Sequence, residues 1–122
     1  MTLLPNEIVR LLPLKPTDFL ILLMLASGER HGYRIMQDIA HQTDGDVRLE
    51  AGHLYRSLRR LLDRGFVDES EQRPAPDVDD ERRRYYRLTP LGRQVLGAEA
   101  GRLRSLVRLA ESQHLIDPET AP

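Results

Sequence analysis

The sequence predicts a mainly α-helical domain with a small β-hairpin. Most of the chain places apolar residues at the three-to-four-residue spacing of helices, whereas residues 66–70 and 83–88 alternate with a period of two. A length of 122 residues suits one domain with a modest core. The content of 40% hydrophobic and 30% charged residues is typical of folded, soluble proteins.

Composition excludes several kinds of site. The chain has no cysteine, which rules out disulfides, thiolate metal sites and cysteine nucleophiles. The longest apolar run, residues 19–26, is far shorter than the roughly 20 residues of a membrane-spanning helix. The N-terminus lacks the basic segment and apolar stretch of a secretory signal, and we expect a cytoplasmic protein.

Proline positions and apolar spacing predict the first two helices. A short helix over residues 5–12 lies within an N-terminal extension, residues 1–15. Thr17 can cap a second helix that runs to Ser27 and stops before a glycine. This helix is apolar on all sides over residues 19–26, which predicts that it forms the centre of the core.

The third helix is predicted over residues 32–43, after a turn at residues 28–32. Residues 44–46 end this helix, and residues 47–49 can form a short extended segment. The residues expected to face inward are Tyr33, Met36, Ile39 and Ala40. For Tyr33, effector sensing is the alternative to a place in the core.

Residues 51–64 form a strongly amphipathic helix. Leu54, Leu58, Leu61 and Leu62 gather on one side. The opposite side holds His53, Arg56, Arg59 and Arg60, with Asp63 as the only acid in the helix. Such a helix can bind nucleic acid, or it can be an ordinary charged surface helix.

Two strands are predicted after this helix, over residues 66–70 and 83–88. The proline-bearing, acidic segment 73–81 between them is expected to be an exposed hairpin tip. Within the second strand, Tyr86 and Leu88 are expected in the core.

Thr89 and Pro90 predict the start of a last helix that runs to about His114. Its apolar residues have the 4-3-4-3 spacing of a coiled-coil seam. The residues of this predicted dimer interface are Leu96, Ala100, Leu103, Leu106, Val107 and Ala110, flanked by Leu109. Gly97 and Gly101 fit either a close helix approach at that interface or a helix of low stability.

Three helices, a hairpin and a trailing helix together describe a winged helix-turn-helix followed by a C-terminal dimerisation helix. The predicted domains are the extension 1–15, the winged helix-turn-helix 16–88, the dimerisation helix 89–115 and a flexible tail 116–122. In this architecture the third helix of the helix-turn-helix domain contacts DNA bases and the hairpin is the wing.

Charge is segregated along the chain. The net charge of −1 and a pI near 6.4 argue mildly against a nucleic-acid partner. However, residues 53–64 carry four arginines against one aspartate, and residues 82–98 carry five arginines and no acid. The local field, and not the sum of charges, steers a polyanion such as DNA.

Three motifs resemble the PadR family of bacterial transcriptional regulators. They are His31-Gly32-Tyr33-Arg34-Ile35, the segment 52–65 with the pattern GxLYxxLxRLxxxG, and the segment 84–92 with the pattern RxYYxLTxxG. The resemblance covers about residues 14–96. It implies a homodimeric winged-helix repressor that docks in successive major grooves of a pseudo-palindromic operator, with a possible small aromatic or hydrophobic effector.

The chain departs from the family pattern at the start of the second motif. The family commonly has Ser-Pro before the glycine and Thr after it, where this chain has Glu50, Ala51 and His53. The wing is longer than usual, and the acids between Asp77 and Glu81 are not expected to touch DNA. Tryptophan is absent, which excludes an effector platform built on that residue.

The expected DNA contacts fall into two groups. The candidates for base edges are His53, Arg56, Ser57 and Arg60, since arginine can bind guanine O6 and N7 together. The candidates for phosphates are Tyr55, Arg59, Arg82, Arg83 and Arg84. Alternatively, the last three arginines neutralise the acidic wing tip.

No metal, cofactor or enzymatic site is predicted. The four histidines share no close ligand spacing, and no phosphate loop, serine elbow or outstanding pair of carboxylates is visible. A DNA-binding repressor is the preferred function. A winged-helix protein-interaction module without duplex contacts is the alternative, because the net charge is near neutral and the wing is acidic.

Overall fold

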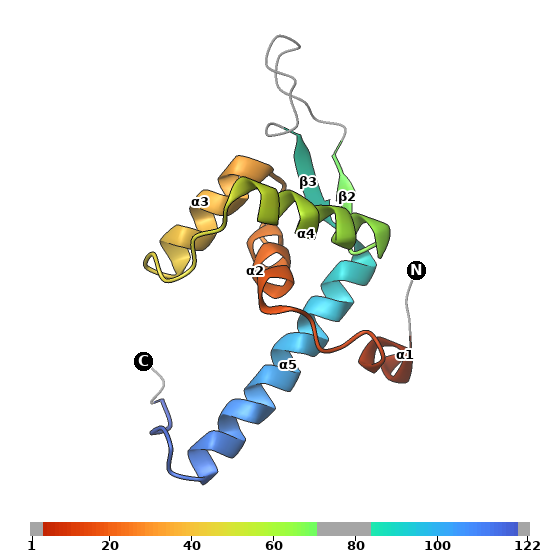
Figure 1. The fold of residues 1–122 in the computed structure, drawn as a ribbon. Helices are drawn as coiled ribbons and strands as arrows, with labels where there is room; N and C mark the ends of the chain where they lie inside the picture. The colour runs from red at the N-terminus through yellow and green to blue at the C-terminus, as the bar shows by residue number, and fades with distance from the viewer. Residues whose placement is uncertain (1–3, 71–83, 120–122) are drawn as a thin grey trace.

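The computed structural model describes residues 4–70 and 84–119 (Figure 1). The elements are α1 (Pro5–Val9), α2 (Pro16–Leu25), β1 (Arg30–His31), α3 (Gly32–Gln42), α4 (Ala51–Asp63), β2 (Val67–Glu69), β3 (Tyr85–Leu88) and α5 (Pro90–Ser112). The predicted mainly helical fold with a small β-structure is confirmed. Among the described residues, no helix has both the length and the apolar character needed to cross a membrane.

Helix α2 lies at the centre of the molecule, as its apolar sequence predicted. It contacts α3, α4, α5 and β3, while α4 lies across the outside of this group (Figure 1). Ile21 and Leu22 of α2 are fully buried. The core residues contributed by α3 and α4 are Ile35, Ile39, Leu54, Leu58 and Leu61. Helix α4 is therefore held by its leucine side, and the opposite side faces away from the core.

The sheet has three strands instead of the predicted two. Its order is β1-β3-β2, and both pairings are antiparallel. Residues 30–31, predicted to be part of a turn, form β1, with Arg30 opposite Tyr86 and His31 opposite Tyr85. A two-residue strand has no periodicity in the sequence, so only its pairing with a distant strand defines it.

The N-terminal helices differ in detail from the prediction. The second helix is not capped by Thr17, because Pro16 is its first residue and Lys15 takes the N-cap position. A proline in the first turn already has the backbone angle of a helix and lacks only an N–H that would have no intrahelical partner. Helix α1 ends at Val9, before the predicted limit of residue 12.

Tyr33 is not a core residue. Its side chain is 52% exposed, whereas Ile35, which was not expected to face inward, is fully buried. Tyr33 is the second residue of α3, next to the buried Gly32. The amphipathic pattern therefore located α3 correctly but assigned its first turn to the wrong side.

Thr89 starts α5 as predicted and also joins three elements. Its hydroxyl oxygen accepts a hydrogen bond from the Gly92 backbone N–H at 2.9 Å and donates one to the Gly65 carbonyl at 2.6 Å. The Thr89 N–H donates to the Phe66 carbonyl at 3.1 Å. The end of α4, the start of β2 and the start of α5 are thereby fixed together.

Candidate nucleic-acid interface

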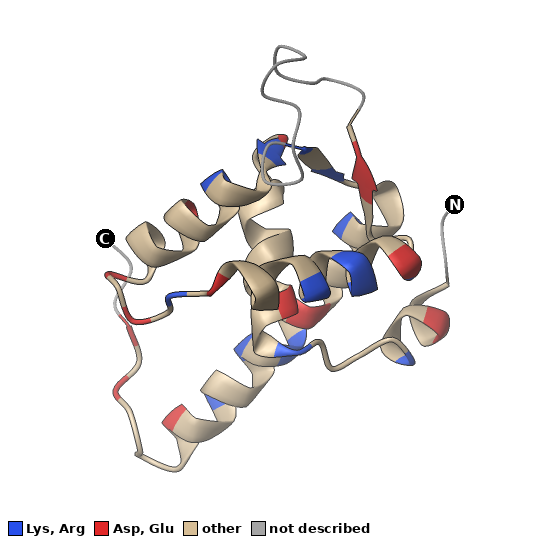
Figure 2. Ribbon diagram, turned by 45° about the horizontal axis from the view of Figure 1, so that its top comes forward, with Lys and Arg blue, Asp and Glu red and all other residues tan. Residues whose placement is uncertain are grey.

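Helix α4 presents an exposed ridge on the side opposite its buried leucines. The ridge consists of Gly52, Arg56, Arg59 and Asp63, which follow one another at intervals of four, three and four residues. All four are exposed. Figure 2 shows the basic positions of this helix as a run along its outer side. The predicted division of residues 51–64 into an apolar and a basic side is thus present in the fold.

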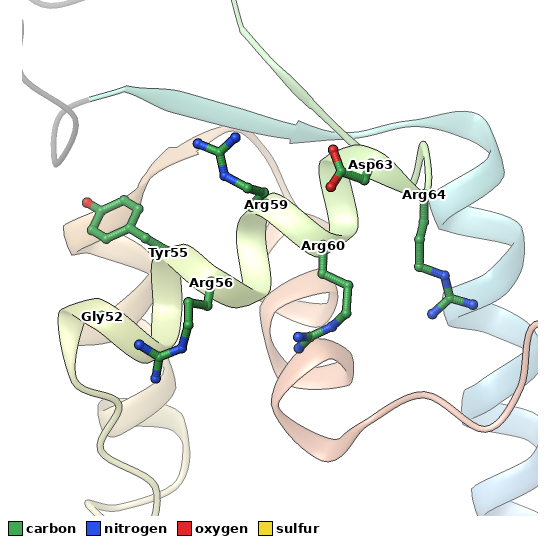
Figure 3. Close-up of a pocket in the computed structure, with 7 residues that line it drawn as sticks. All are labelled: Gly52, Tyr55, Arg56, Arg59, Arg60, Asp63 and Arg64. Carbon is green, nitrogen blue, oxygen red and sulfur yellow. The ribbon is translucent and has the colours of Figure 1, made fainter.

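An open recess of about 590 Å³ follows this ridge (Figure 3). The residues that line it are Gly52, Tyr55, Arg56, Arg59, Arg60, Asp63 and Arg64. Four of these seven residues are arginines, so the recess is strongly basic. A shallow basic surface on an exposed helix suits an extended polyanion better than an enclosed small molecule.

The side chains of Arg56 and Arg59 are available for a partner. Both residues are exposed. Figure 3 shows Arg56 on the side of α4 toward α2 and Arg59 on the side toward β3. Within the described part of the chain, neither guanidinium forms an ion pair or a hydrogen bond. His53 is also exposed, near the start of the helix.

Tyr55 is half-buried because it packs against the start of α3. A Cβ atom placed on Gly32 would lie 2.6 Å from the Tyr55 hydroxyl and 3.0 Å from its ring. Gly32 therefore permits the ring to lie close to the α3 backbone. Tyr55 serves first as a contact between the two helices, and its side chain is less available to DNA than those of Arg56 and Arg59.

The structure contradicts the expectation that Ser57 contacts a base edge. Ser57 has no exposed surface. It lies three residues after Leu54 and four before Leu61, and this spacing places it on the buried side of the helix. Its hydroxyl accepts a hydrogen bond from the Arg60 guanidinium at 3.2 Å, so it serves an internal contact.

Arg60 is paired with a buried carboxylate instead of projecting freely from α4. Its Nε and Nη2 atoms donate to the two Asp18 oxygens at 3.1 and 2.7 Å. The Asp18 residue is 1% exposed. The hydrogen bond to Asp18 raises the pKa of Arg60 above its ordinary value. The geometry does not support a base contact by Arg60.

The base of the wing is only partly described. Arg82, Arg83 and the acidic segment 77–81 lie outside the described residues. Arg84 is half-buried and pairs with Glu69 of β2 at 3.3 Å. Arg87 of β3 is exposed, although the sequence did not single it out as a contact. Its alternation with the buried Tyr86 was the signal for an outward-facing cation.

Residues 21–98, more than half of the chain, match the transcriptional regulator PadR-like family. The chain belongs to this family. It is 38% identical over 83 residues to the transcriptional regulator Rv3488 of Mycobacterium tuberculosis, a match that covers 68% of this chain and 71% of that protein. The resemblance inferred from the three motifs is therefore confirmed.

Solved structures show the same fold. A transcriptional regulator from Clostridium thermocellum matches with a TM-score of 0.67 at 23% identity, over 90% of this chain and 97% of that chain. Bacillus subtilis PadR in complex with operator DNA matches with a TM-score of 0.57 at 22% identity, over 90% of this chain and 52% of that chain. The PadR-like family and these neighbours are regulators and not enzymes.

Two buried carboxylates were missed in the sequence. Besides Asp18, Glu99 of α5 is 1% exposed. It accepts hydrogen bonds from the Leu14 N–H at 2.9 Å and from Arg102 at 2.6 and 3.0 Å. The Arg102 bonds outweigh the effect of burial and lower the pKa of Glu99. Arg60, the partner of Asp18, is 42 residues away and no local spacing reveals it, whereas Glu99 and Arg102 have the i,i+3 spacing of a helical ion pair. No cluster of three metal-binding side chains occurs among the residues described.

A third acid joins two arginines near the start of α3. Asp38 accepts from Arg30 at 3.0 Å and from Arg34 at 2.8 Å. Burial acts to raise the pKa of Asp38, but the two arginine contacts outweigh it and lower that pKa. The contact anchors β1 to α3.

Of the predicted dimer residues, Leu96 is wrongly assigned. It is 7% exposed and belongs to the core of a single chain, because the first half of α5 packs against the domain. The exposed fractions of Leu106 and Val107 are 49% and 48%, and that of Leu109 is 57%. Ala100 is exposed, and Leu103 and Ala110 are half-buried. The apolar surface available for an interface therefore begins later on α5 than predicted.

Proposed function

We propose that this PadR-like regulator is a repressor that binds a pseudo-palindromic DNA operator as a homodimer. The observation that carries the proposal is the exposed ridge of α4, where Arg56 and Arg59 face outward without a partner in the described part of the chain. A similar fold is solved for Bacillus subtilis PadR with operator DNA. In helix-turn-helix proteins such a helix lies in the major groove.

The proposed contacts differ along the helix. Arg56 and His53, which are exposed in the first half of α4, contact base edges. Arg59 and Arg84 contact phosphates and set the register of the protein on the duplex, whereas the Tyr55 hydroxyl, predicted to join them, is buried against the start of α3. Arg82 and Arg83 complete the phosphate contacts from the wing.

The distal half of α5 is the proposed contact between the two copies. Its exposed apolar residues are Leu106, Val107 and Leu109, at the end of the helix that extends away from the rest of the molecule (Figure 1). An exposed apolar stripe of this kind is stabilised when a second copy covers it. With Leu96 in the core, Ala100, Leu103 and Ala110 complete the proposed contact.

We place a small hydrophobic effector in a recess between the start of α2 and α5. The recess has a volume of about 290 Å³. Its lining residues are Leu14, Pro16, Phe19, Leu20, Glu99, Arg102 and Leu103. Because Leu103 also belongs to the proposed dimer contact, an occupant of this recess can alter the arrangement of the two copies and hence of their α4 helices.

Fluorescence anisotropy tests the proposal. The wild-type protein is first used to enrich duplexes from a random-sequence pool, and its affinity for the enriched duplex and for a scrambled version is measured over a salt series. We expect tighter binding to the enriched duplex and a log affinity that falls linearly with log salt. Absence of enrichment and of a salt slope would instead support the protein-interaction module.

A further inference from the structure

The ion pair between Asp18 and Arg60 connects α4 to the central helix α2. Asp18 lies in the first turn of α2, and Arg60 lies in the second half of α4. Two hydrogen bonds, of 3.1 and 2.7 Å, join the guanidinium to both carboxylate oxygens. Figure 3 shows Arg60 pointing from α4 toward α2, on the same side as Arg56.

Two features make this pair more than a surface contact. The Asp18 residue is 1% exposed, and an unpaired charge at such a site is strongly unfavourable. A guanidinium that bonds both carboxylate oxygens is fixed in orientation as well as in distance. The Arg60 side chain is 34% exposed, so water reaches it, but its Nε and Nη2 donors are already used.

The pair also fixes the rotation of α4 about its own axis. Arg60 Nη2 donates to the buried Ser57 Oγ at 3.2 Å as well as to Asp18, so the guanidinium is held both against its own helix and against α2. Rotation of α4 would break the two bonds to Asp18 and would move Arg56 and Arg59 around the exposed face together.

We propose that Asp18 and Arg60 form a positioning pair that orients α4 for DNA recognition and withholds the Arg60 charge from phosphates. Arg60 then contributes to sequence discrimination through Asp18, and not through a base. This inference rests on the proposed DNA-binding function. Under this inference, Arg56 is the arginine of α4 that contacts bases, and Arg59 contacts a phosphate.

The decisive variant is Asp18→Ala, which releases Arg60. We expect the ratio of the affinity for the enriched duplex to the affinity for the scrambled duplex to fall about tenfold, because α4 loses its fixed rotation. This is the size of the discrimination that one good base contact provides. The released guanidinium can reach a phosphate, so the log–log salt slope on scrambled DNA should steepen by about one. Glu119→Ala removes the same charge from an exposed position far along the chain and should change neither value.

The double variant Asp18→Ala/Arg60→Ala separates positioning from base contact. A positioning role predicts the same low affinity ratio as in Asp18→Ala, with a salt slope that returns to the wild-type value. A base contact by Arg60 predicts that Asp18→Ala retains discrimination and that only the double variant loses it. That second result would overturn the proposal.

Folding and function are controlled separately. Thermal unfolding followed by circular dichroism establishes that each variant is folded, and Asp18→Asn, which keeps the size of the side chain, replaces the alanine variant if that one does not fold. A wild-type protein that binds no duplex from the pool refutes the proposed function. If the wild-type protein distinguishes the enriched duplex from the scrambled one, but Asp18→Ala leaves the affinity ratio and the salt slope unchanged, only the positioning role is refuted.

Discussion

Replacement of Gly92 by alanine tests the junction that joins α4, β2 and α5. A Cβ atom at Gly92 would overlap the Phe66 carbonyl oxygen and would lie 2.9 Å from Leu88 Cδ1. The Phe66 carbonyl cannot move freely, because it accepts the Thr89 N–H hydrogen bond at 3.1 Å. Accommodating one methyl group therefore requires a backbone shift at the start of both β2 and α5.

The expected loss follows from two costs and one gain. Overpacking against a fixed backbone costs about 3 kcal/mol, and loss of the Thr89–Phe66 hydrogen bond costs about 1 kcal/mol. The higher helix propensity of alanine returns about 1 kcal/mol. We expect Gly92→Ala to lower the free energy of unfolding by about 3 kcal/mol overall.

Urea unfolding followed by far-ultraviolet circular dichroism, at one fixed protein concentration, measures this change. Gly101→Ala is the matched control on the same helix, since no atom outside the local backbone lies within 4 Å of the position that its new methyl group would take. It should raise the free energy of unfolding by up to about 1 kcal/mol. A loss below about 1 kcal/mol for Gly92→Ala would refute the argument that the close approach of the Phe66 carbonyl requires glycine here. Destabilisation by Gly101→Ala would favour a close helix contact at the proposed dimer interface.

Three further predictions address the ion pairs and surfaces. Arg56→Ala should cost roughly 1–3 kcal/mol of binding to the enriched duplex and much less on scrambled DNA, measured by anisotropy; equal losses on both would exclude a base contact. Glu99→Gln should lower the free energy of unfolding by about 2 kcal/mol at neutral pH. Because the folded-state pKa of Glu99 is lowered, its contribution to stability is present above the ordinary pKa of glutamate and is lost as the pH falls through the lowered value. Urea unfolding at several pH values should therefore show that the difference in free energy of unfolding between variant and wild type becomes smaller in acid. If the proposed homodimer forms through the end of α5, Leu106→Asp combined with Val107→Asp should yield a monomer in sedimentation velocity. A sedimentation coefficient equal to that of a dimeric wild type would exclude this part of α5 from the interface.

Local sequence patterns were sufficient for the helices near the candidate site. The predicted helix over residues 51–64 is observed as α4, Ala51–Asp63, with Leu54, Leu58 and Leu61 in the core. The predicted start of α5 at Thr89 and Pro90 is also observed. Both features depend on residues within one or two turns of each other, so periodicity and capping chemistry are enough to define them.

Two candidate residues were assigned to the wrong surroundings. Ser57 was chosen because it lies toward the N-terminal end of its helix, although its spacing from Leu54 and Leu61 already placed it on the buried side of α4. Leu96 was grouped with the dimer seam because the apolar series is continuous along α5. The change from core to exposed surface along that helix depends on where the rest of the domain ends, and periodicity carries no information about that point.

By itself, the sequence determined the helical architecture, the family and the basic side of α4, since each follows from local spacing or from motifs in a fixed order. Only the tertiary structure decided which of the α4 arginines are available. Arg56 and Arg59 remain exposed, whereas Arg60 is held by Asp18, 42 residues away along the chain. Nothing local marks such a partner, because an ion pair between two helices depends on how they pack against each other.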